Sequence, residues 1–407
     1  MDQTSPSNSS QETLPTVSNL PHQDLSPAER RKRLGELAQV FLRLGLTAFG
    51  GPAAHIALMD HEVVQRRQWL TREELLDLLG ITQLIPGPNS TELAIHIGYQ
   101  RSGWLGLWVA GSCFILPAMG LVWGLAALYA QYQTFPQMEW LMYGIKPVII
   151  AIVGQALIKL GWSAIKGQLT LLAAIAALVG YRLGWSEIMM LIGLGLLVMG
   201  IQQGIENRQG MGLFLGLGMT ELAQIPSPKG VNSPNGLTVF WFFLKIGSVL
   251  YGSGYVLLAF LQRELVENYH WLTPQQLLDA VAIGQFTPGP VFTTATFVGY
   301  LLAGNIGAIA GTVGIFLPAF LLVGLVHPWV NRLKQSAWVR GFLAGVNAAS
   351  LGLMAGVTIT LGQSALVDYL TVGLCLLSGL LLWRFSLNSA WLILGGAAIG
   401  WLTQAYQ

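Results

Sequence analysis

Long apolar stretches dominate the chain and are separated by short polar loops. Trp104–Ala130 and Gly341–Val367 contain no Asp, Glu, Lys, Arg or His, and each exceeds the ~20 residues that a membrane-spanning helix needs. Asn305–Val326 and Phe385–Gln407 are similarly uncharged. A soluble helical protein would not carry apolar runs of this length. The pattern therefore predicts an all-α polytopic membrane protein embedded in a lipid bilayer.

The chain also repeats itself at an offset of 202 residues. Residues 69–88 and 271–290 are identical at 11 of 20 positions, including the closing Pro-Gly-Pro. We therefore predict two homologous membrane repeats, residues 34–203 and 237–404, each with about 5–6 membrane segments. Residues 1–33 are expected to form a disordered cytoplasmic tail that ends in a basic anchor, and residues 204–236 to form a linker.

Each repeat is expected to contain the same series of segments. The first is an apolar helix interrupted by glycine (34–66 and 237–266), and the second is interrupted by Pro-Gly-Pro (73–101 and 275–301). Four uninterrupted stretches follow in each repeat, near 104–130, 140–160, 168–183 and 186–201 in the first, and 305–327, 339–361, 366–383 and 388–404 in the second.

Basic residues in equivalent loops suggest how the repeats are oriented. The loop at 131–139 has no Lys or Arg, whereas its counterpart at 328–340 has three. The bias reverses in the next pair of loops, because Lys159 and Lys166 have no counterpart in 362–368. Lys and Arg favour the cytoplasmic side, so we predict inverted-topology repeats, as in many secondary transporters. Two parallel repeats with uneven loop charges are the alternative.

Inversion leaves the number of crossings open. Equivalent points of inverted repeats must be separated by an odd number of crossings. Either one interrupted segment is re-entrant, or residues 210–223 add a crossing.

The Pro-Gly-Pro interruptions provide the clearest candidate chemistry. Two prolines and a glycine must break the helix, because each proline removes an amide donor and glycine permits a sharp bend. The helix that restarts at Asn89 presents free amides and a positive dipole end, which suit a small anion. We expect substrate contacts from both interruptions and the polar residues after them: Pro86, Gly87, Pro88, Asn89, Ser90, Thr91, Pro288, Gly289, Pro290 and Thr293. A kinked helix without a ligand is the alternative.

Glycine breaks in the first segment of each repeat are a second candidate. Gly50 and Gly51 in the first repeat, and Gly252 in the second, allow close backbone approach. Such positions could hold further half-helix ends or pack helices tightly. His55 follows the first break and is either a substrate contact or a packed, hydrogen-bonded residue.

Charged residues inside apolar segments complete the candidate site. Arg43 and Lys245 occupy equivalent positions and could bind a dianion together with the half-helix amides, or extend to the interface. Lys146 could line the same pathway. Asp77, Glu92 and Asp279 are candidates for proton coupling, although a solvated helix face would also explain the two aspartates.

Composition narrows the class further. Charged residues make up 10% of the chain and the formal net charge is +2, which argues against a nucleic-acid partner. Cys113 and Cys375 lie in apolar runs and are not expected to pair. No zinc-protease, nucleophile-elbow or phosphate-loop motif occurs, so neither an enzyme nor a cofactor or metal site is expected.

Three stretches together resemble the chromate ion transporter family, in its long two-domain form. They are FLRLGLTAFGGPAAHIALM (41–59), WLTREELLDLLGITQLIPGP (69–88) and the reprise FTPGP (286–290). The resemblance implies a multi-pass protein of the prokaryotic plasma (inner) membrane. It also implies chromate export driven by the proton gradient, which gives chromate resistance. The second repeat departs from the pattern, because Gly-Ser-Gly replaces Gly-Gly-Pro and His55 has no equivalent. The first repeat is therefore expected to supply the decisive contacts.

Other functions remain alternatives at this point. Sulfate is a tetrahedral dianion of similar size to chromate, so uptake or exchange of sulfate or another oxyanion is one alternative. A gated anion channel is another, and an intramembrane enzyme a third. A homo-oligomer is compatible with the sequence.

Overall fold

The computed structural model describes residues 26–133, 135–206, 234–251, 254–385, 387 and 389–405. These residues are almost entirely helical, and no strand occurs among them. Five of the described helices are long and apolar enough to cross a membrane. The prediction of an all-α polytopic membrane protein is confirmed. The predicted tail up to residue 25, residues 210–223 and Gly252 lie outside the described residues.

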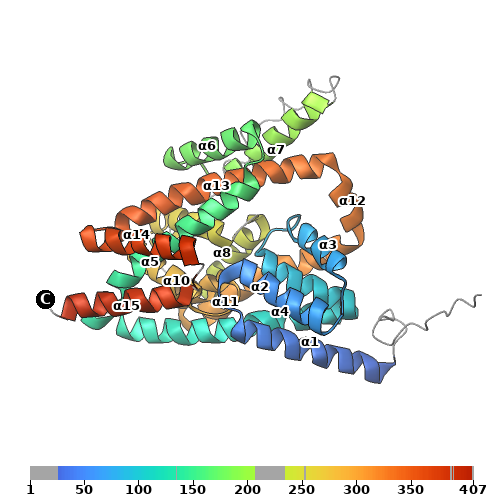
Figure 1. Ribbon diagram of the computed structural model, residues 1–407, viewed down its shortest axis with the longest axis horizontal. Helices are drawn as coiled ribbons and strands as arrows, with labels where there is room; N and C mark the ends of the chain where they lie inside the picture. Colours follow the sequence, from blue (N-terminus) through green and yellow to red (C-terminus); the bar gives the residue numbers. More distant parts are fainter. Residues whose placement is uncertain are drawn as a thin grey trace, which may run out of the picture.

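Helix bounds follow the predicted segments closely, except that α1 begins at Pro27, where Ser26 and Glu29 form a capping box. The basic residues at 30–33, expected in a disordered tail, are therefore helical. The first repeat contains α1 (Pro27–Thr47), α2 (Gly51–Met59), the π-helix η3 (Asp60–Arg66), α3 (Arg72–Thr82), α4 (Asn89–Tyr132), α5 (Pro136–Ala164), α6 (Gln168–Arg182) and α7 (Glu187–Glu206). The second contains α8 (Gly236–Val249), η4 (Gly254–Val256), α9 (Leu257–Leu261), the π-helix η5 (Gln262–Asn268), α10 (Pro274–Phe286), η6 (Val291–Thr293), α11 (Thr294–Val326), η7 (His327–Trp329), α12 (Val330–Gln335), α13 (Ala337–Ala365), α14 (Tyr369–Phe385) and α15 (Ser389–Ala405). In Figure 1, α1 projects from the end of the molecule opposite to the C-terminus.

The repeated Trp-Leu-Thr motif explains where two of these helices begin. Thr71 caps α3 by accepting a hydrogen bond from the amide of Glu74, whose side chain accepts one from the Thr71 amide. Thr273 and Gln276 make the same capping box at the start of α10. A capping box satisfies two amides that the helix itself leaves without partners.

The longest helix of each repeat is folded back on itself. Ser102–Gly103 in α4 and Ala303–Gly304 in α11 have non-helical backbone angles. A Cβ on Gly98 would collide with the carbonyl of Gly106, although residues eight apart in a straight helix lie about 12 Å from each other. Gly299 and Gly307 make the same contact in α11. Each helix is therefore a hairpin with a short first arm and a long second arm that can span the bilayer.

Both interrupted segments of the first repeat return to the end of the molecule from which they started. Arg101, at the end of the first arm of α4, binds Glu36 of α1 with an N–O distance of 2.7 Å. The same guanidinium lies 4.0 Å from the ring of Trp69, between η3 and α3. The first half of α1, the start of α3, the end of η3 and the end of the first arm of α4 therefore all lie close to Arg101. Two re-entrant hairpins reach inward from this end, which we call the basic end because it also carries Arg33, Arg66 and Arg67.

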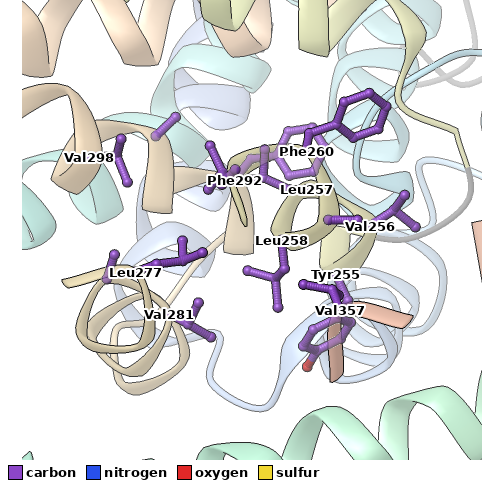
Figure 2. Close-up of a cluster of buried hydrophobic side chains, with 14 of the residues drawn as sticks. Tyr255, Val256, Leu257, Leu258, Phe260, Leu277, Val281, Phe292, Val298 and Val357 are labelled. Atoms are coloured by element: carbon purple, nitrogen blue, oxygen red, sulfur yellow. The ribbon is translucent and has the colours of Figure 1, made fainter. Parts of the chain in front are cut away.

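The second repeat buries its re-entrant segment in apolar side chains. Figure 2 shows Leu257, Leu258 and Phe260 gathered with residues of α10 and with Phe292, just before α11. All three are at most 2% exposed. The region around α9 therefore forms much of the hydrophobic core.

The long arms of α4 and α11 pack in opposite directions. A Cβ on Gly324 would meet the ring of Trp104, while the Trp123 indole donates a hydrogen bond of 3.0 Å to the Asn305 side chain. The start of one arm therefore lies beside the end of the other. Because these arms are equivalent in the two repeats, their antiparallel packing supports inverted repeats, which we retain as a proposal.

Inversion predicts that residues 135 and 336, at equivalent points before α5 and α13, lie on opposite faces of the membrane. Phe135→Cys and Ser336→Cys are introduced singly into a background with Cys113→Ala and Cys375→Ala. We expect an impermeant maleimide to label Phe135→Cys in intact cells, and Ser336→Cys only after the cells are permeabilised. Labelling of both positions from the same side would refute inversion.

Candidate functional site

Four helix ends, two from each repeat, meet in the interior of the molecule. The amide of Gly87, in the first Pro-Gly-Pro, donates a hydrogen bond of 2.8 Å to the carbonyl of Leu250, after α8. The amide of Gly289, in the second, donates one of 3.0 Å to the carbonyl of Ala48, after α1. The two bonds are equivalent under the offset of 202 residues. Each repeat therefore supplies the hydrogen-bond acceptor for the Pro-Gly-Pro amide of the other.

Glycine is required in both Pro-Gly-Pro segments. Gly87 has a φ of 139° and Gly289 a φ of 94°, values that other residues rarely adopt. A Cβ on Gly289 would lie 2.6 Å from the Cβ of Ala118, and one on Gly87 would collide with the Glu92 carboxylate. As predicted, the helix restarts at Asn89 after the first interruption.

His55 joins the two breaks of the first repeat. Its Nε2 lies 3.0 Å from the carbonyl oxygen of Ala48, and its Nδ1 lies 3.2 Å from Oγ of Ser90. Because a carbonyl only accepts, Nε2 must carry the hydrogen, and Nδ1 can accept from the Ser90 hydroxyl. The predicted alternative of a buried, hydrogen-bonded histidine fits this geometry. In the second repeat the apolar Leu257 takes its place.

The start of α4 carries polar groups that the described protein does not satisfy. Thr91 and Glu92 are fully buried, and neither the Thr91 hydroxyl nor either Glu92 carboxylate oxygen has a hydrogen-bond partner among the described residues. At the equivalent place, the Thr293 hydroxyl donates to the carbonyl of Pro290, 2.8 Å away. A buried polar group without a partner is costly. At this helix start, and among the described residues, the threonine hydroxyl of the first repeat is therefore free for a ligand, whereas that of the second is not.

A basic pocket lies along α1 and η3. Its volume is about 360 Å³, and Arg43, His61, Glu62 and Arg66 are among its lining residues. Glu62 is an ion-pair partner of Arg43 (3.5 Å), Arg66 (3.1 Å) and Arg67 (3.5 Å). Three guanidinium groups around one carboxylate leave a net positive charge that can attract an anion. Sequence reasoning identified Arg43 but missed Arg66 and Glu62, although the charged run DHEVVQRR was visible.

The predicted charged residues Arg43, Lys245 and Asp77 lie apart from the Pro-Gly-Pro breaks. Lys245 and Asp77 are exposed, and no described contact joins Arg43 or Lys245 to either Pro-Gly-Pro. Gly50 and Gly51, with φ values of 103° and 78°, start α2. Gly252 lies outside the described residues.

Asp279 differs from its equivalent, Asp77, because it is buried. One carboxylate oxygen accepts a hydrogen bond of 2.7 Å from the Tyr129 hydroxyl, and the other lies 3.5 Å from Nζ of Lys146. The interpretation of Asp279 as part of a solvated face is therefore wrong. This ion pair instead joins α10 to α4 and α5, and it gives the isolated Lys146 a partner.

Comparison with known proteins supplies the family. The model of the chromate transporter family matches residues 35–201 and 237–401. The chain is 32% identical to a chromate transport protein of Cupriavidus metallidurans, over 90% of this chain and 92% of that protein. It is 31% identical to a probable chromate transport protein of Synechococcus elongatus, over 86% of this chain and 90% of that protein. No solved structure matches.

These matches cover both repeats and agree with the apolar helices and the paired Pro-Gly-Pro breaks. They place the protein in the prokaryotic plasma membrane as a multi-pass protein. The chain therefore belongs to the chromate transporter family.

Proposed function

We propose that this protein is a secondary active transporter that exports chromate from the cytoplasm, coupled to the proton gradient. The meeting of four helix ends through the Gly87–Leu250 and Gly289–Ala48 hydrogen bonds carries this proposal. Broken helices from both repeats that meet inside the membrane form the substrate site in many secondary transporters. The names of the similar proteins support chromate as the substrate.

The route of the anion follows the distribution of positive charge. The basic pocket formed by Arg43 and Arg66 lies on the first re-entrant hairpin, where it can attract a tetrahedral dianion. Further inward, the start of α4 offers the amides of Asn89 and Ser90 and the Thr91 hydroxyl, whereas the Thr91 amide is bound to the carbonyl of Pro88. A charge-assisted hydrogen bond from that hydroxyl would satisfy a group that otherwise has no partner.

The two repeats would provide the alternating access. Their antiparallel long arms contact each other directly, so a tilt of one repeat against the other would open the central site first to one side and then to the other. The arginines of the basic end favour a cytoplasmic location for that end.

Flux measurements test this function directly. We expect proteoliposomes to move radiolabelled chromate, and a pH gradient to change the rate. Sulfate is measured in parallel, because a tetrahedral dianion of similar size would make the same contacts. Faster flux of sulfate than of chromate would favour the alternative of sulfate exchange. Flux that ignores the pH gradient and is not saturable would favour an anion channel.

Replacing Arg43 with Gln should weaken chromate binding by roughly 1.5–3 kcal/mol if its guanidinium makes a charge-assisted contact with the anion. The fold should survive, because Glu62 keeps Arg66 and Arg67 as partners. Binding is measured by calorimetry on purified protein. Arg72→Gln, at an exposed position in the first turn of α3, is the matched control. Equal affinities in Arg43→Gln and the parent would show that Arg43 does not contact the anion.

Thr91→Val removes the unpartnered hydroxyl while nearly keeping the side-chain shape. We expect an unfolding temperature that does not fall, together with a loss of about 1.5–3 kcal/mol in chromate binding. Thr293→Val is the comparison: it should lower stability by about 0.5–1.5 kcal/mol, because the Thr293 hydroxyl is hydrogen-bonded, and should affect binding less. Thermal unfolding and calorimetry measure both effects. A Thr91→Val protein with undiminished affinity would move the substrate site away from the start of α4.

A further inference from the structure

Three titratable groups line one side of the first arm of α4. Glu92 and His96 are four residues apart, so they are neighbours on the same helix face, with Cβ atoms about 5–6 Å apart. His96 is fully buried, and its Nδ1 lies 3.2 Å from Nδ1 of His327. His327 begins η7, after the long arm of α11, and is half-buried. The groups therefore run from the Pro-Gly-Pro break towards the basic end.

No charged group among the described residues pairs with Glu92. Among the described neighbours, Tyr251 is close enough to interact electrostatically, and His55 is hydrogen-bonded to Ser90. Arg101, at the end of the same arm, is bound to Glu36. An ionised carboxylate that is buried without a partner is so costly that such a group takes up a proton instead. In this conformation Glu92 is therefore expected to be neutral.

The histidine pair has the geometry for transferring a proton. Two imidazole nitrogens that face each other form a hydrogen bond only when one of them carries a hydrogen and the other does not. Moving that hydrogen from one Nδ1 to the other transfers a proton between His327 and His96. Tyr99, one turn beyond His96, packs its ring 4.4 Å from the ring of His327 and holds it in place.

We propose that His327 and His96 carry protons between the basic end and Glu92, and that protonation of Glu92 and binding of a tetrahedral dianion at the start of α4 strengthen each other. His327 takes a proton from water and passes it through the two Nδ1 atoms. No hydrogen bond joins His96 to the Glu92 carboxylate in this conformation, so the Glu92 side chain must turn from Gly87 towards His96. His96 then releases a proton from its other ring nitrogen to the carboxylate, and the reverse steps return it. This proposal rests on the proposed function.

Charge explains the coupling. Thr91, the proposed donor to the anion, and Glu92 are adjacent residues at one helix end. A negative carboxylate there would repel a dianion, whereas the protonated form would not. Linkage is reciprocal, so a bound dianion must favour the protonated form of Glu92 by the same factor.

The pH dependence of sulfate binding tests the coupling, because sulfate stays a dianion between pH 5 and 9. In the parent we expect affinity to fall by up to about tenfold per pH unit once Glu92 ionises, as linkage to one proton requires. Glu92→Gln, which resembles the protonated form, should bind at least as tightly and without that pH dependence. Glu73→Gln, exposed on α3, is the control and should behave like the parent. Equal pH dependence in the parent and Glu92→Gln would overturn the proposal.

A second experiment tests the histidine route. His96→Phe and His327→Phe should keep the affinity for sulfate at low pH but slow proton entry, measured with a pH-sensitive dye inside vesicles after an anion gradient is applied, at least tenfold. His270→Asn is the control, because asparagine tolerates the positive φ of 52° at that position. Unchanged proton entry in both Phe variants would overturn the route. Absence of binding of both chromate and sulfate by the parent would instead refute the proposed function.

Discussion

Every backbone amide and carbonyl inside a bilayer must find a partner within the protein. A helix broken in the membrane interior violates this rule unless another segment supplies the missing bond. Here the amide of Gly87 donates to the carbonyl of Leu250, and the amide of Gly289 donates to the carbonyl of Ala48. These two hydrogen bonds allow all four breaks to exist, and they set the distance between the repeats. The capped helices α3 and α10, the folded hairpins of α4 and α11 and the central site are all arranged around them.

The two repeats use this shared frame differently. In the second repeat, Leu257 and Phe292 seal the break with apolar side chains, and Thr293 bonds to its own turn. In the first repeat, His55, Ser90, Thr91 and Glu92 occupy the corresponding space. A symmetric scaffold therefore carries different side chains at its two breaks. That the first repeat supplies the decisive contacts stays a prediction.

Much of the fold could be predicted from the sequence, because apolar length and the Pro-Gly-Pro breaks are local signals. The repeat was equally visible, because Trp-Leu-Thr recurs in both halves of the sequence. In each half its threonine caps a helix, which is a local rule. The partners of the breaks were not predictable: nothing near Gly87 in the sequence indicates Leu250. The same holds for Asp279, whose burial depends on Lys146 and Tyr129 from other helices. His96 and His327 were missed because their pairing depends on how the first arm of α4 packs against the end of α11.

The exchange of hydrogen bonds between repeats also bears on the evolution of the fold. A chain with a single repeat has one Pro-Gly-Pro amide that can donate and one carbonyl at its glycine break that can accept. In this fold each of these groups bonds to the other repeat, and the two do not bond to each other. Such a chain cannot satisfy itself and would need a second copy, turned over in the membrane, to complete both bonds. Gene duplication and fusion would then make permanent a pairing that an ancestral dimer already required. After fusion, only one half had to keep polar residues at its break, and the other was free to become apolar.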